Sequence, residues 1–336
     1  MHVVRIGLLG CGRIGRVHAD SVTVHPRAEL VGVFDPVEAA AAEVADQFGS
    51  VPTTDESAII DDPSIDAAVV ASPTPTHVDL LTRAVRAGKA VLCEKPIDLD
   101  LARVDACRSQ LGALTGRVMV GFNRRFDPSF RDVRARVADG EVGELEQLVI
   151  ISRDPVPPPP GYVGTSGGLF RDMTIHDFDM ARYFLGEVTA VTATGANLIS
   201  SEIADAGDID GAVVVLTGAS GALASITNSR RCAFGYDQRL EAFGERGMLL
   251  AANQLPTSVR FSGAEATEVA PAYVNFFLDR YTLAYRAELD HFVTGVEDGT
   301  PFSPGFDDGR AALVLAHAAA ESLRTGATVQ VLAIGR

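Results

Sequence analysis

A lysine, an aspartate and a histidine stand in sequence surroundings that could support proton transfer. Lys95 follows the apolar run AVLC and a glutamate, and a proline comes directly after it. Asp172 and His176 are four residues apart, a spacing that puts two side chains on one face of a helix. An imidazole can accept a proton near neutral pH, a carboxylate can orient it or bind a hydroxyl group, and an ammonium group can stabilise a developing oxyanion.

Each of these patterns also has a simpler interpretation. A lysine in an isolated EKP sequence is more often a solvated surface residue, and an Asp–His pair at helical spacing is more often an ordinary polar pair. A zinc site is disfavoured because Asp172 and His176 lack a third ligand at a recognisable spacing. The cysteines lack CxxC spacing, so they indicate neither a zinc site nor a disulfide framework; they are Cys11, Cys93, Cys107 and Cys232.

A glycine motif near the start of the sequence could hold a dinucleotide. Gly10, Gly12 and Gly15 have the spacing G-x-G-x-x-G, after an apolar run and before a helix-like segment. In such a motif the glycines permit a tight turn, close approach of a pyrophosphate and close helix packing, with the phosphate at the helix N-terminus. A glycine turn without a ligand is the alternative for the motif alone. The residues expected to contact a dinucleotide here are Gly10, Gly12, Arg13, Ile14 and Gly15.

A carboxylate at the end of the second apolar run indicates which dinucleotide is bound. Asp35 comes twenty residues after Gly15, where a carboxylate accepts hydrogen bonds from the adenosine ribose. This carboxylate would repel a 2′-phosphate, and the following Pro36 supplies no cation. The sequence therefore predicts NAD rather than NADP. An aspartate that caps the next helix is compatible with both roles.

The first third of the chain must position these residues on a parallel sheet. Short apolar runs alternate with helix-like segments, which is typical of βαβ units. We predict an α/β protein whose N-terminal Rossmann dinucleotide-binding domain covers residues 1–121. Lys95 would then lie beyond the carboxyl end of a parallel strand, where open α/β sheets bind their ligands.

The pattern changes after residue 121. From about residue 145 strand-like runs follow one another, and the clusters GASG and GERG indicate hairpin turns. We predict that residues 122–336 form a substrate-binding and oligomerisation domain, an α/β unit with a large open, mainly antiparallel sheet. Residues 155–168 are predicted to form an ordered loop or lid, with a flexible linker as the alternative. Helices are predicted over residues 169–185, 285–296 and 307–326, and the last two could pack back on the first domain.

Composition restricts the partners of the protein. The formal net charge of -15 disfavours nonspecific binding to nucleic acid or to an anionic membrane, which requires an excess of Lys and Arg. No apolar run approaches the length of a membrane span, and the first residues lack the features of an export signal. A cytoplasmic protein is expected, with scattered cysteines that suit a reducing compartment.

Taken in order, the motifs resemble those of the glucose-fructose oxidoreductase and inositol dehydrogenase family. The segments that carry the resemblance are GCGRIG, SPTPTHVDL, EKP and GGLFRDMTIHDFDMARYFL, and it extends over essentially the full chain. The stretch from GFNRRFDPSF through VIISRDPVPPP to FRDMTIHDFDMARYF more narrowly resembles bacterial inositol 2-dehydrogenases. The resemblance implies that Lys95, Asp172 and His176 form a catalytic set around a cyclic polyol, and that the open sheet is an oligomer interface.

The resemblance also implies roles for further residues. Ser72, Thr74 and His77 would line the nicotinamide side of the cofactor. Glu94 and Lys95 would lie where cofactor and substrate meet, and Arg125 would reach both. Tyr236 would contact the substrate, and Asp154 is a candidate for a further contact with a substrate hydroxyl.

The expected reaction is the NAD-dependent oxidation of myo-inositol to 2-keto-myo-inositol (scyllo-inosose), without a metal. His176 would be the general base, Lys95 would bind the reacting oxygen, and Asp172 would orient the hydroxyls or the histidine. Shared motifs leave scyllo-inositol, glucose or a nucleotide sugar as alternative substrates. A noncatalytic NAD-binding sensor is disfavoured because it would be expected to lose one of the three residues. A homotetramer is the expected assembly.

Overall fold

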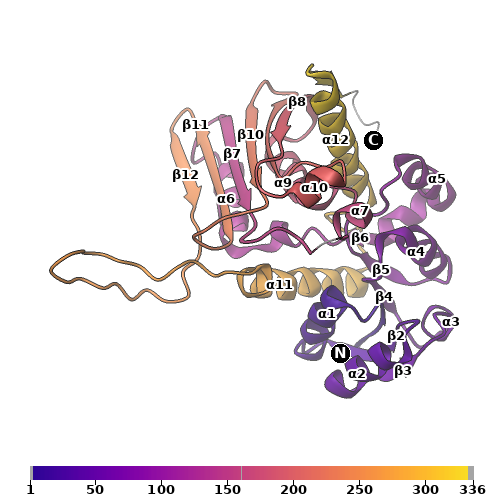
Figure 1. Ribbon diagram of the computed structural model, residues 1–336. Coiled ribbons are helices and arrows are strands. Elements are labelled where there is room, and N and C mark those ends of the chain that lie inside the picture. Colours follow the sequence, from indigo (N-terminus) through magenta and orange to yellow (C-terminus); the bar gives the residue numbers. More distant parts are fainter. Residues whose placement is uncertain (1–2, 160, 332–336) are drawn as a thin grey trace. The chain divides into compact units, whose positions relative to one another are not determined.

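The strand–helix alternation at the beginning of the chain forms one parallel sheet of six strands, in the order β3-β2-β1-β4-β5-β6. This order and the parallel pairing confirm the predicted Rossmann fold. The computed structural model describes residues 3–159 and 161–331 (Figure 1). The strands are β1 (Val4–Leu9), β2 (Ala28–Phe34), β3 (Val51–Thr53), β4 (Ala67–Val70), β5 (Ala90–Cys93) and β6 (Val118–Val120). The helices between them are α1 (Arg13–Thr23), α2 (Glu38–Phe48), α3 (Ser57–Ile60), α4 (His77–Arg86) and α5 (Leu101–Leu111), with 3₁₀ turns η1 (Thr74–Thr76), η2 (Gly112–Arg117) and η3 (Asn123–Phe126).

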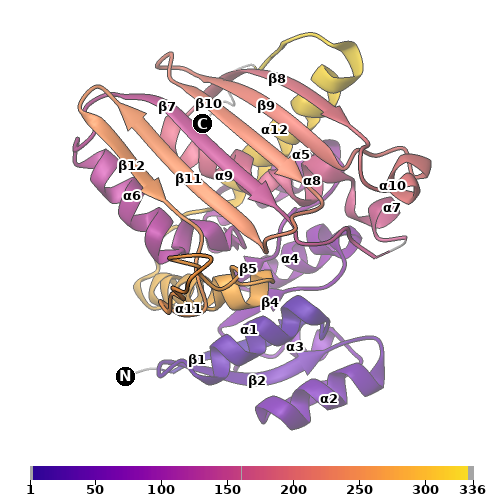
Figure 2. The same ribbon diagram turned by 60° about the vertical axis from the view of Figure 1, so that its left-hand side comes forward.

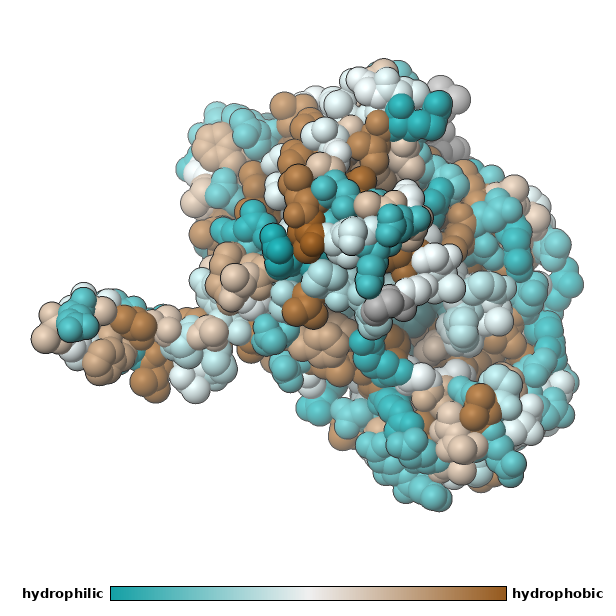
Figure 3. All heavy atoms as spheres, in the orientation of Figure 1, coloured by the Kyte–Doolittle hydropathy of each residue, from teal (hydrophilic) through white to brown (hydrophobic). Residues whose placement is uncertain are grey.

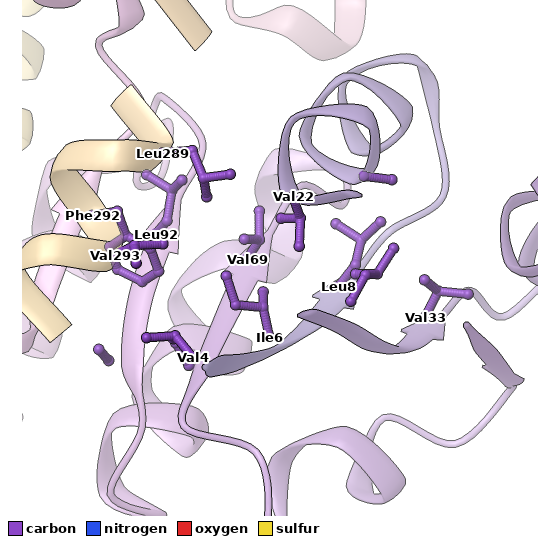
Figure 4. Close-up of a cluster of buried hydrophobic side chains, with 14 of the residues drawn as sticks. Val4, Ile6, Leu8, Val22, Val33, Val69, Leu92, Leu289, Phe292 and Val293 are labelled. Carbon is purple, nitrogen blue, oxygen red and sulfur yellow. The ribbon is translucent and has the colours of Figure 1, made fainter. Parts of the chain in front are cut away.

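The chain divides into two compact units, and the first takes a segment from near the C-terminus. It comprises Met1–Phe126 and Leu283–Leu313, and the second comprises Asp127–Thr282 and Val314–Arg336. Most of α11 (Phe277–Asp298) therefore belongs to the first unit, and its apolar side chains join the core of the parallel sheet. Figure 4 shows Leu289, Phe292 and Val293 among the buried side chains of the strands. The predicted boundary between residues 121 and 122 stays a prediction.

The second unit contains a seven-stranded sheet in the order β12-β11-β7-β10-β9-β8-β13. Its strands are β7 (Leu145–Arg153), β8 (Val188–Ala196), β9 (Gly211–Gly218), β10 (Leu223–Ser229), β11 (Asp237–Gly244), β12 (Gly247–Ala251) and β13 (Val329–Gln330). The two predicted hairpin turns join β9 to β10 and β11 to β12. Neighbouring strands are antiparallel as predicted, except that β7 and β10 run parallel. This parallel pair makes the sheet mixed.

Helices cover one face of this sheet, and none of the described helices lies on the other face, which we call the open face. The described helices of this part of the chain are α6 (Pro128–Ala138), α7 (Val163–Ser166), α8 (Leu169–Asp172), α9 (Thr174–Leu185), α10 (Ser201–Asp205) and α12 (Phe306–Thr325). Figure 2 looks onto the strands, with α6, α9 and α12 behind them. Residues alternate between buried and exposed along β9, where Val213 and Val215 point to the open face.

Two predicted segments differ in detail from the structure. The helix expected over residues 169–185 is interrupted at Met173, so that Asp172 ends α8 and His176 lies in the first turn of α9. The Thr174 hydroxyl bonds to the carbonyl of Leu169 and to the Asn228 side chain, in competition with the helical pattern. The predicted loop over residues 155–168 contains the short helix α7, and Pro160 lies outside the described residues.

A long loop over residues 252–276 joins β12 to α11 and projects from the second unit (Figure 1). Hydrophobic residues lie along it in the surface view of Figure 3, and Val259 and Phe261 are among the exposed ones. None of the helices within residues 3–159 and 161–331 is long and apolar enough to cross a membrane.

Candidate active site

The glycine turn after β1 is shaped by contacts within the first unit, except at Gly12. Gly10 has a φ of 110°, and a Cβ there would meet the backbone of Ser72 at 2.6 Å. A Cβ on Gly15 would lie 2.0 Å from the carbonyl oxygen of Gly10. A Cβ on Gly12 would meet no atom within 4 Å, although Gly12 stands at the N-cap of α1. The open space at a helix N-terminus fits a dinucleotide pyrophosphate.

Asp35 follows β2 and lies beside the glycine turn. Its Oδ2 accepts a hydrogen bond from the backbone N–H of Cys11 at 3.0 Å, and Oδ1 accepts one from Val37 at 2.9 Å. Each carboxylate oxygen has a second lone pair that can accept from a ribose hydroxyl. The backbone contacts fix the carboxylate next to the turn, as a ribose-binding residue requires.

The segments that follow β4 and β5 are tied together by His77. Its Nε2 lies 2.7 Å from the carbonyl oxygen of Ser72, and its Nδ1 lies 2.8 Å from that of Pro96. The Ser72 hydroxyl also pairs with that of Thr76, beside Thr74 in η1. His77 is therefore a buried residue that links the segments after two strands through hydrogen bonds. Its predicted contact with the cofactor stays a prediction.

Lys95 occupies the position predicted for it, directly beyond the carboxyl end of β5. Its side chain is half-buried, and the Lys95–Pro96 peptide bond is cis. The backbone N–H of Lys95 donates to the Glu94 carboxylate at 3.3 Å. The partial burial distinguishes Lys95 from a solvated surface lysine.

Glu94 belongs to a buried polar cluster that the sequence did not predict. Its Oε1 lies 2.8 Å from Nε2 of His18 in α1. Burial disfavours its charge, but His18 and the nearby Lys95 outweigh this effect and hold the pKa of Glu94 below its ordinary value. Glu288 of α11 is also completely buried, and burial, reinforced by the charge of Glu94, raises its pKa well above the ordinary 4.5. The cluster thus contains two carboxyl groups whose pKa values are shifted in opposite directions.

Arg125 has a partner within the first unit. Its Nη2 donates to Oδ1 of Asp308 at 3.0 Å, and Oδ2 of Asp308 accepts from the backbone N–H of Gly305. Only 7% of the Arg125 side chain is exposed, so Arg125 is a buried, ion-paired residue. The predicted contacts of Arg125 with cofactor and substrate stay a prediction.

In the second unit, the ends of two parallel strands bring a carboxylate and a guanidinium together. Arg153 pairs with Ser229 in the last register of β7 and β10, so Asp154 and Arg230 follow at the same edge. Nη1 of Arg230 lies 3.5 Å from Asp154 and donates to Oδ2 of Asp172 at 3.0 Å. The structure therefore brings together the predicted residues Asp154 and Asp172.

Arg230 was not among the residues predicted from the sequence. It follows the stretch LASITNS, whose last three residues are polar, so no apolar run marks its position as AVLC does for Glu94 and Lys95. The parallel pairing of β7 with β10 could not be foreseen, and without it nothing placed Arg230 beside Asp154.

The helix that carries His176 is anchored to the same strand ends. Asp177, its neighbour, accepts hydrogen bonds from Ser152 Oγ at 2.6 Å and from Asn228 Nδ2 at 2.8 Å. Ser152 and Asn228 are the second-last residues of β7 and β10. His176 itself is half-buried. A buried network therefore fixes the start of α9 at the edge where Asp154 and Asp172 lie.

Tyr236 stands at this edge as well, directly before β11. Asp237, the first residue of β11, pairs with Arg153 at the end of β7. The ring of Tyr236 is buried and packs edge-on against Tyr281, with centroids 6.0 Å apart. The predicted residues Asp154, Asp172, His176 and Tyr236 thus all come from elements that end or begin at one sheet edge.

The six-stranded parallel sheet and the glycine turn define an NAD-binding protein of the Rossmann class, and the mixed sheet supplies a second unit with Asp154, Asp172 and Arg230 at the ends of its strands. The chain belongs to the GFO/IDH/MocA oxidoreductase family. The model of its NAD-binding Rossmann fold matches residues 4–122, and the model of its C-terminal domain matches residues 130–250. Among the described residues, no group of three or more His, Cys, Asp or Glu side chains could hold a metal ion.

Several relatives are similar to this chain over nearly its full length. The chain is 50% identical to the inositol 2-dehydrogenase of Rhizobium meliloti over 322 residues, which cover 95% of this chain and 97% of that protein. A crystal structure of a myo-inositol dehydrogenase from Corynebacterium glutamicum matches with a TM-score of 0.96 at 53% identity, covering 98% and 99% of the two chains. The scyllo-inositol dehydrogenase from Lactobacillus casei, with bound NAD(H) and scyllo-inositol, matches with a TM-score of 0.89 at 28% identity and covers 98% and 99%.

Proposed function

We propose that the protein oxidises myo-inositol to 2-keto-myo-inositol (scyllo-inosose) with NAD. The observation that carries this proposal is the 50% identity to an inositol 2-dehydrogenase over nearly the whole of both chains. The polar side chains at the strand ends of the second unit, among them Asp154, Asp172 and His176, support the proposal because they can form hydrogen bonds with a ligand rich in hydroxyl groups. When bound, NAD accepts a hydride at C4 of its nicotinamide ring.

The proposed division of labour gives each of three residues a separate task. His176 accepts the proton of the hydroxyl that is oxidised. Lys95 donates a hydrogen bond to the same oxygen and stabilises its alkoxide character. Asp172 accepts hydrogen bonds from substrate hydroxyls and orients the ring. Asp154, Tyr236 and Arg125 complete the proposed substrate contacts, and Ser72, Thr74, His77 and Glu94 the proposed cofactor contacts.

A second candidate substrate is scyllo-inositol. It is supported by the solved structure of the Lactobacillus casei enzyme, which contains bound scyllo-inositol and is similar over 98% of this chain. The two cyclitols differ only in the configuration of one hydroxyl group, and both are hydrogen-bonding rings of the same size. Motifs shared by both kinds of enzyme do not distinguish between them.

A substrate panel tests the proposed function. Purified protein is mixed with NAD and with myo-inositol, scyllo-inositol, glucose or a nucleotide sugar, and reduced cofactor is followed by absorbance. We expect the highest kcat/KM with myo-inositol. A higher value with scyllo-inositol would replace the substrate assignment, and turnover of none of them would favour a noncatalytic NAD sensor.

The same assay tests the preference for NAD over NADP. The carboxylate of Asp35 should repel a 2′-phosphate, so we expect a clearly higher kcat/KM with NAD. Asp35→Ser removes the charge and should narrow the difference. Equal kcat/KM of the unmodified protein with the two cofactors would contradict the ribose contact.

The proposal extends to the setting of the reaction. We propose a cytoplasmic homotetramer that acts in the catabolism of myo-inositol. The exposed apolar residues of the open sheet face support self-association. Cell fractionation and growth of a deletion strain on myo-inositol as the carbon source would test location and pathway.

A further inference from the structure

Arg230 lies among acidic side chains at the edge of the second unit's sheet. Only 3% of its side chain is exposed. Nη1 lies within 3.5 Å of both Asp154 and Asp172, and Asp208 adds a third nearby carboxylate. Burial disfavours the charge of Arg230, but these carboxylates outweigh it and raise its pKa above the ordinary value. Arg230 is therefore a buried cation within an acidic group.

The backbone holds Arg230 firmly in this place. Its N–H donates to the carbonyl of Asp210 at 2.8 Å, and the N–H of Asp154 donates to the carbonyl of Ser229 at 2.9 Å. The carboxylate of Asp210 is completely buried and accepts three backbone hydrogen bonds from residues 198–200. The strand end that carries Arg230 is thus fixed before any substrate arrives.

Asp172 is held from both sides. Its Oδ2 accepts from Arg230 at 3.0 Å, and its Oδ1 accepts from the hydroxyl of Tyr162 at 3.0 Å. Each carboxylate oxygen has further acceptor capacity. An ionised carboxylate only accepts hydrogen bonds, whereas a protonated one also donates. The charge state of Asp172 therefore decides whether it acts only as an acceptor toward substrate hydroxyls or can also donate a hydrogen bond.

We propose that Arg230 is a positioning residue that keeps Asp172 ionised and oriented, so that Asp172 acts as an acceptor for substrate hydroxyls. This inference rests on the proposed function only for the identity of the ligand. Nε and Nη2 of Arg230 are shielded from solvent and have no hydrogen-bond partner among the described residues. Because Nη1 of Arg230 contacts the carboxylates of Asp154 and Asp172, we assign the effect of Arg230 to these two side chains.

Loss of Arg230 should change the ionisation of its neighbours. Without the guanidinium, Asp154 and Asp172 would stand together as like charges in a partly buried place, whereas Asp208 would keep its electrostatic interaction with Arg171. Like charges at short range, with no cation between them, favour uptake of a proton by one carboxyl group. Arg230→Met should therefore raise the pH at which Asp172 takes up its proton. Arg230→Lys keeps the positive charge but loses the paired donors of the guanidinium.

The first experiment reads this ionisation without substrate. The ¹³C chemical shift of the Asp172 carboxyl is titrated with pH in protein labelled at aspartate, and Asp172→Asn assigns the signal. We expect the midpoint to rise by about one pH unit or more in Arg230→Met, and by less in Arg230→Lys. Because no turnover is needed, this result is independent of the proposed reaction.

The second experiment measures kinetics with the substrate that the panel identifies. In Arg230→Met we expect KM to rise about tenfold or more, since a hydrogen bond to a charged group is disturbed. The acid limb of the pH profile of kcat/KM should move to higher pH, and binding of NAD should be unchanged. Arg230→Lys should recover part of the loss.

Arg182→Met is the matched control. Arg182 of α9 is also largely buried and forms a two-pronged ion pair with Glu187, at 3.0 and 3.1 Å. The Arg182→Met variant should lower the stability of the protein. It should leave the titration midpoint of the Asp172 carboxyl and the KM for substrate unchanged. If Arg230→Met does not fold, Arg230→Lys decides the question. A folded Arg230 variant with the Asp172 midpoint and the KM of the unmodified protein, altered only in Tm, would overturn the proposal.

Discussion

At the scale of single residues, Lys95 and His176 are both half-buried, and this burial allows the effect of truncating each side chain to be predicted. Both sit at the ends of well-fixed elements, so truncation should leave the fold intact. His176→Ala removes the proposed base, and we expect turnover to fall about 10²-fold or more. Lys95→Ala should cost as much or more, because its charge stabilises the oxyanion in the transition state. Single-turnover rates with myo-inositol measure both effects.

Binding of NAD provides the control for this prediction. The dinucleotide is expected at the glycine turn and Asp35, so its Kd should change little in either variant. Surface residues without a catalytic role could be truncated with little loss of rate. Near-normal hydride transfer in Lys95→Ala would therefore reject the role assigned to Lys95.

Glu288 leads to a prediction about stability and pH. Its pKa is raised well above 4.5 by burial, with the charge of Glu94 adding to the effect. The folded state thus keeps a proton that the unfolded chain releases above about pH 4.5. This contribution to stability is full at low pH and is lost as the pH rises toward the pKa of the folded state. Its slope is about 1.4 kcal/mol per pH unit.

The variant Glu288→Gln tests this sign. Glutamine is neutral at every pH, so its free energy of unfolding relative to the unmodified protein should increase from pH 5 upward. Urea titrations at several pH values measure the difference. Glu141→Gln is the control, because the hydrogen bond from Arg136 lowers the pKa of Glu141 and keeps it ionised over the same range. A difference for Glu288→Gln that does not vary with pH would contradict an uncharged Glu288.

At the scale of elements, the turn before α1 contains one glycine that the fold requires and one that is expected to be required for binding NAD. A methyl group on Gly15 would collide with the carbonyl of Gly10 at 2.0 Å, so Gly15→Ala should unfold the turn and lower Tm. A methyl group on Gly12 would enter open space, so Gly12→Ala should keep Tm close to normal. It should nevertheless weaken NAD binding, because it fills the place of close approach to the pyrophosphate. Thermal unfolding and NAD titration of both variants provide the comparison.

The outcome for Gly12 decides the interpretation. Gly12→Ala with unchanged affinity for NAD would mean that the pyrophosphate does not approach this residue. Loss of affinity together with a large fall in Tm would mean that Gly12, like Gly15, is required by the fold.

The sequence predicted those elements whose pattern is local. Alternating apolar runs identified the parallel sheet, and GASG and GERG identified two hairpins. Interruption of the helix at Met173 could not be predicted, because it involves Asn228, which is distant in sequence. The parallel pairing of β7 with β10 is likewise a long-range choice between strands that look alike in sequence. Both features decide how Asp172 meets Arg230.

For the candidate site residues, the sequence predicted where a residue lies in the fold better than it predicted which side chains or backbone groups that residue contacts. Lys95 was expected beyond β5 and lies there. His77, in contrast, is held by two backbone carbonyls, and Arg125 is held by Asp308 from α12. A motif identifies which residues a family uses, but partners that come from distant segments require the folded chain.

At the scale of the whole molecule, the chain crosses between its units more than once. Residues 283–313 return to the first unit, and residues 314–336 belong to the second. Leu289, Phe292 and Val293 are therefore part of the core of the parallel sheet, so truncation before α11 would remove part of that core. The two units are expected to depend on the same C-terminal segment for stability.

The open face of the seven-stranded sheet leads to the last prediction, which concerns assembly. Exposed apolar side chains on β9 and β12 lie on the face that none of the described helices covers, and Val215 and Leu250 are 42% and 54% exposed. A broad apolar sheet face of this kind is typical of an association surface. We expect a homotetramer, or at least a dimer, by light scattering at micromolar concentration.

A charged side chain placed on this face should break the assembly. Val215→Lys puts an ammonium group where an apolar contact is expected, so the mass should fall toward that of the monomer. Leu114→Lys is the matched control, because Leu114 is also 42% exposed but belongs to η2 of the first unit. Its mass should stay that of the unmodified protein. Two results would show that the sheet face is not the interface. One is that the unmodified protein is a monomer. The other is that Val215→Lys leaves the assembly intact while Leu114→Lys dissociates it.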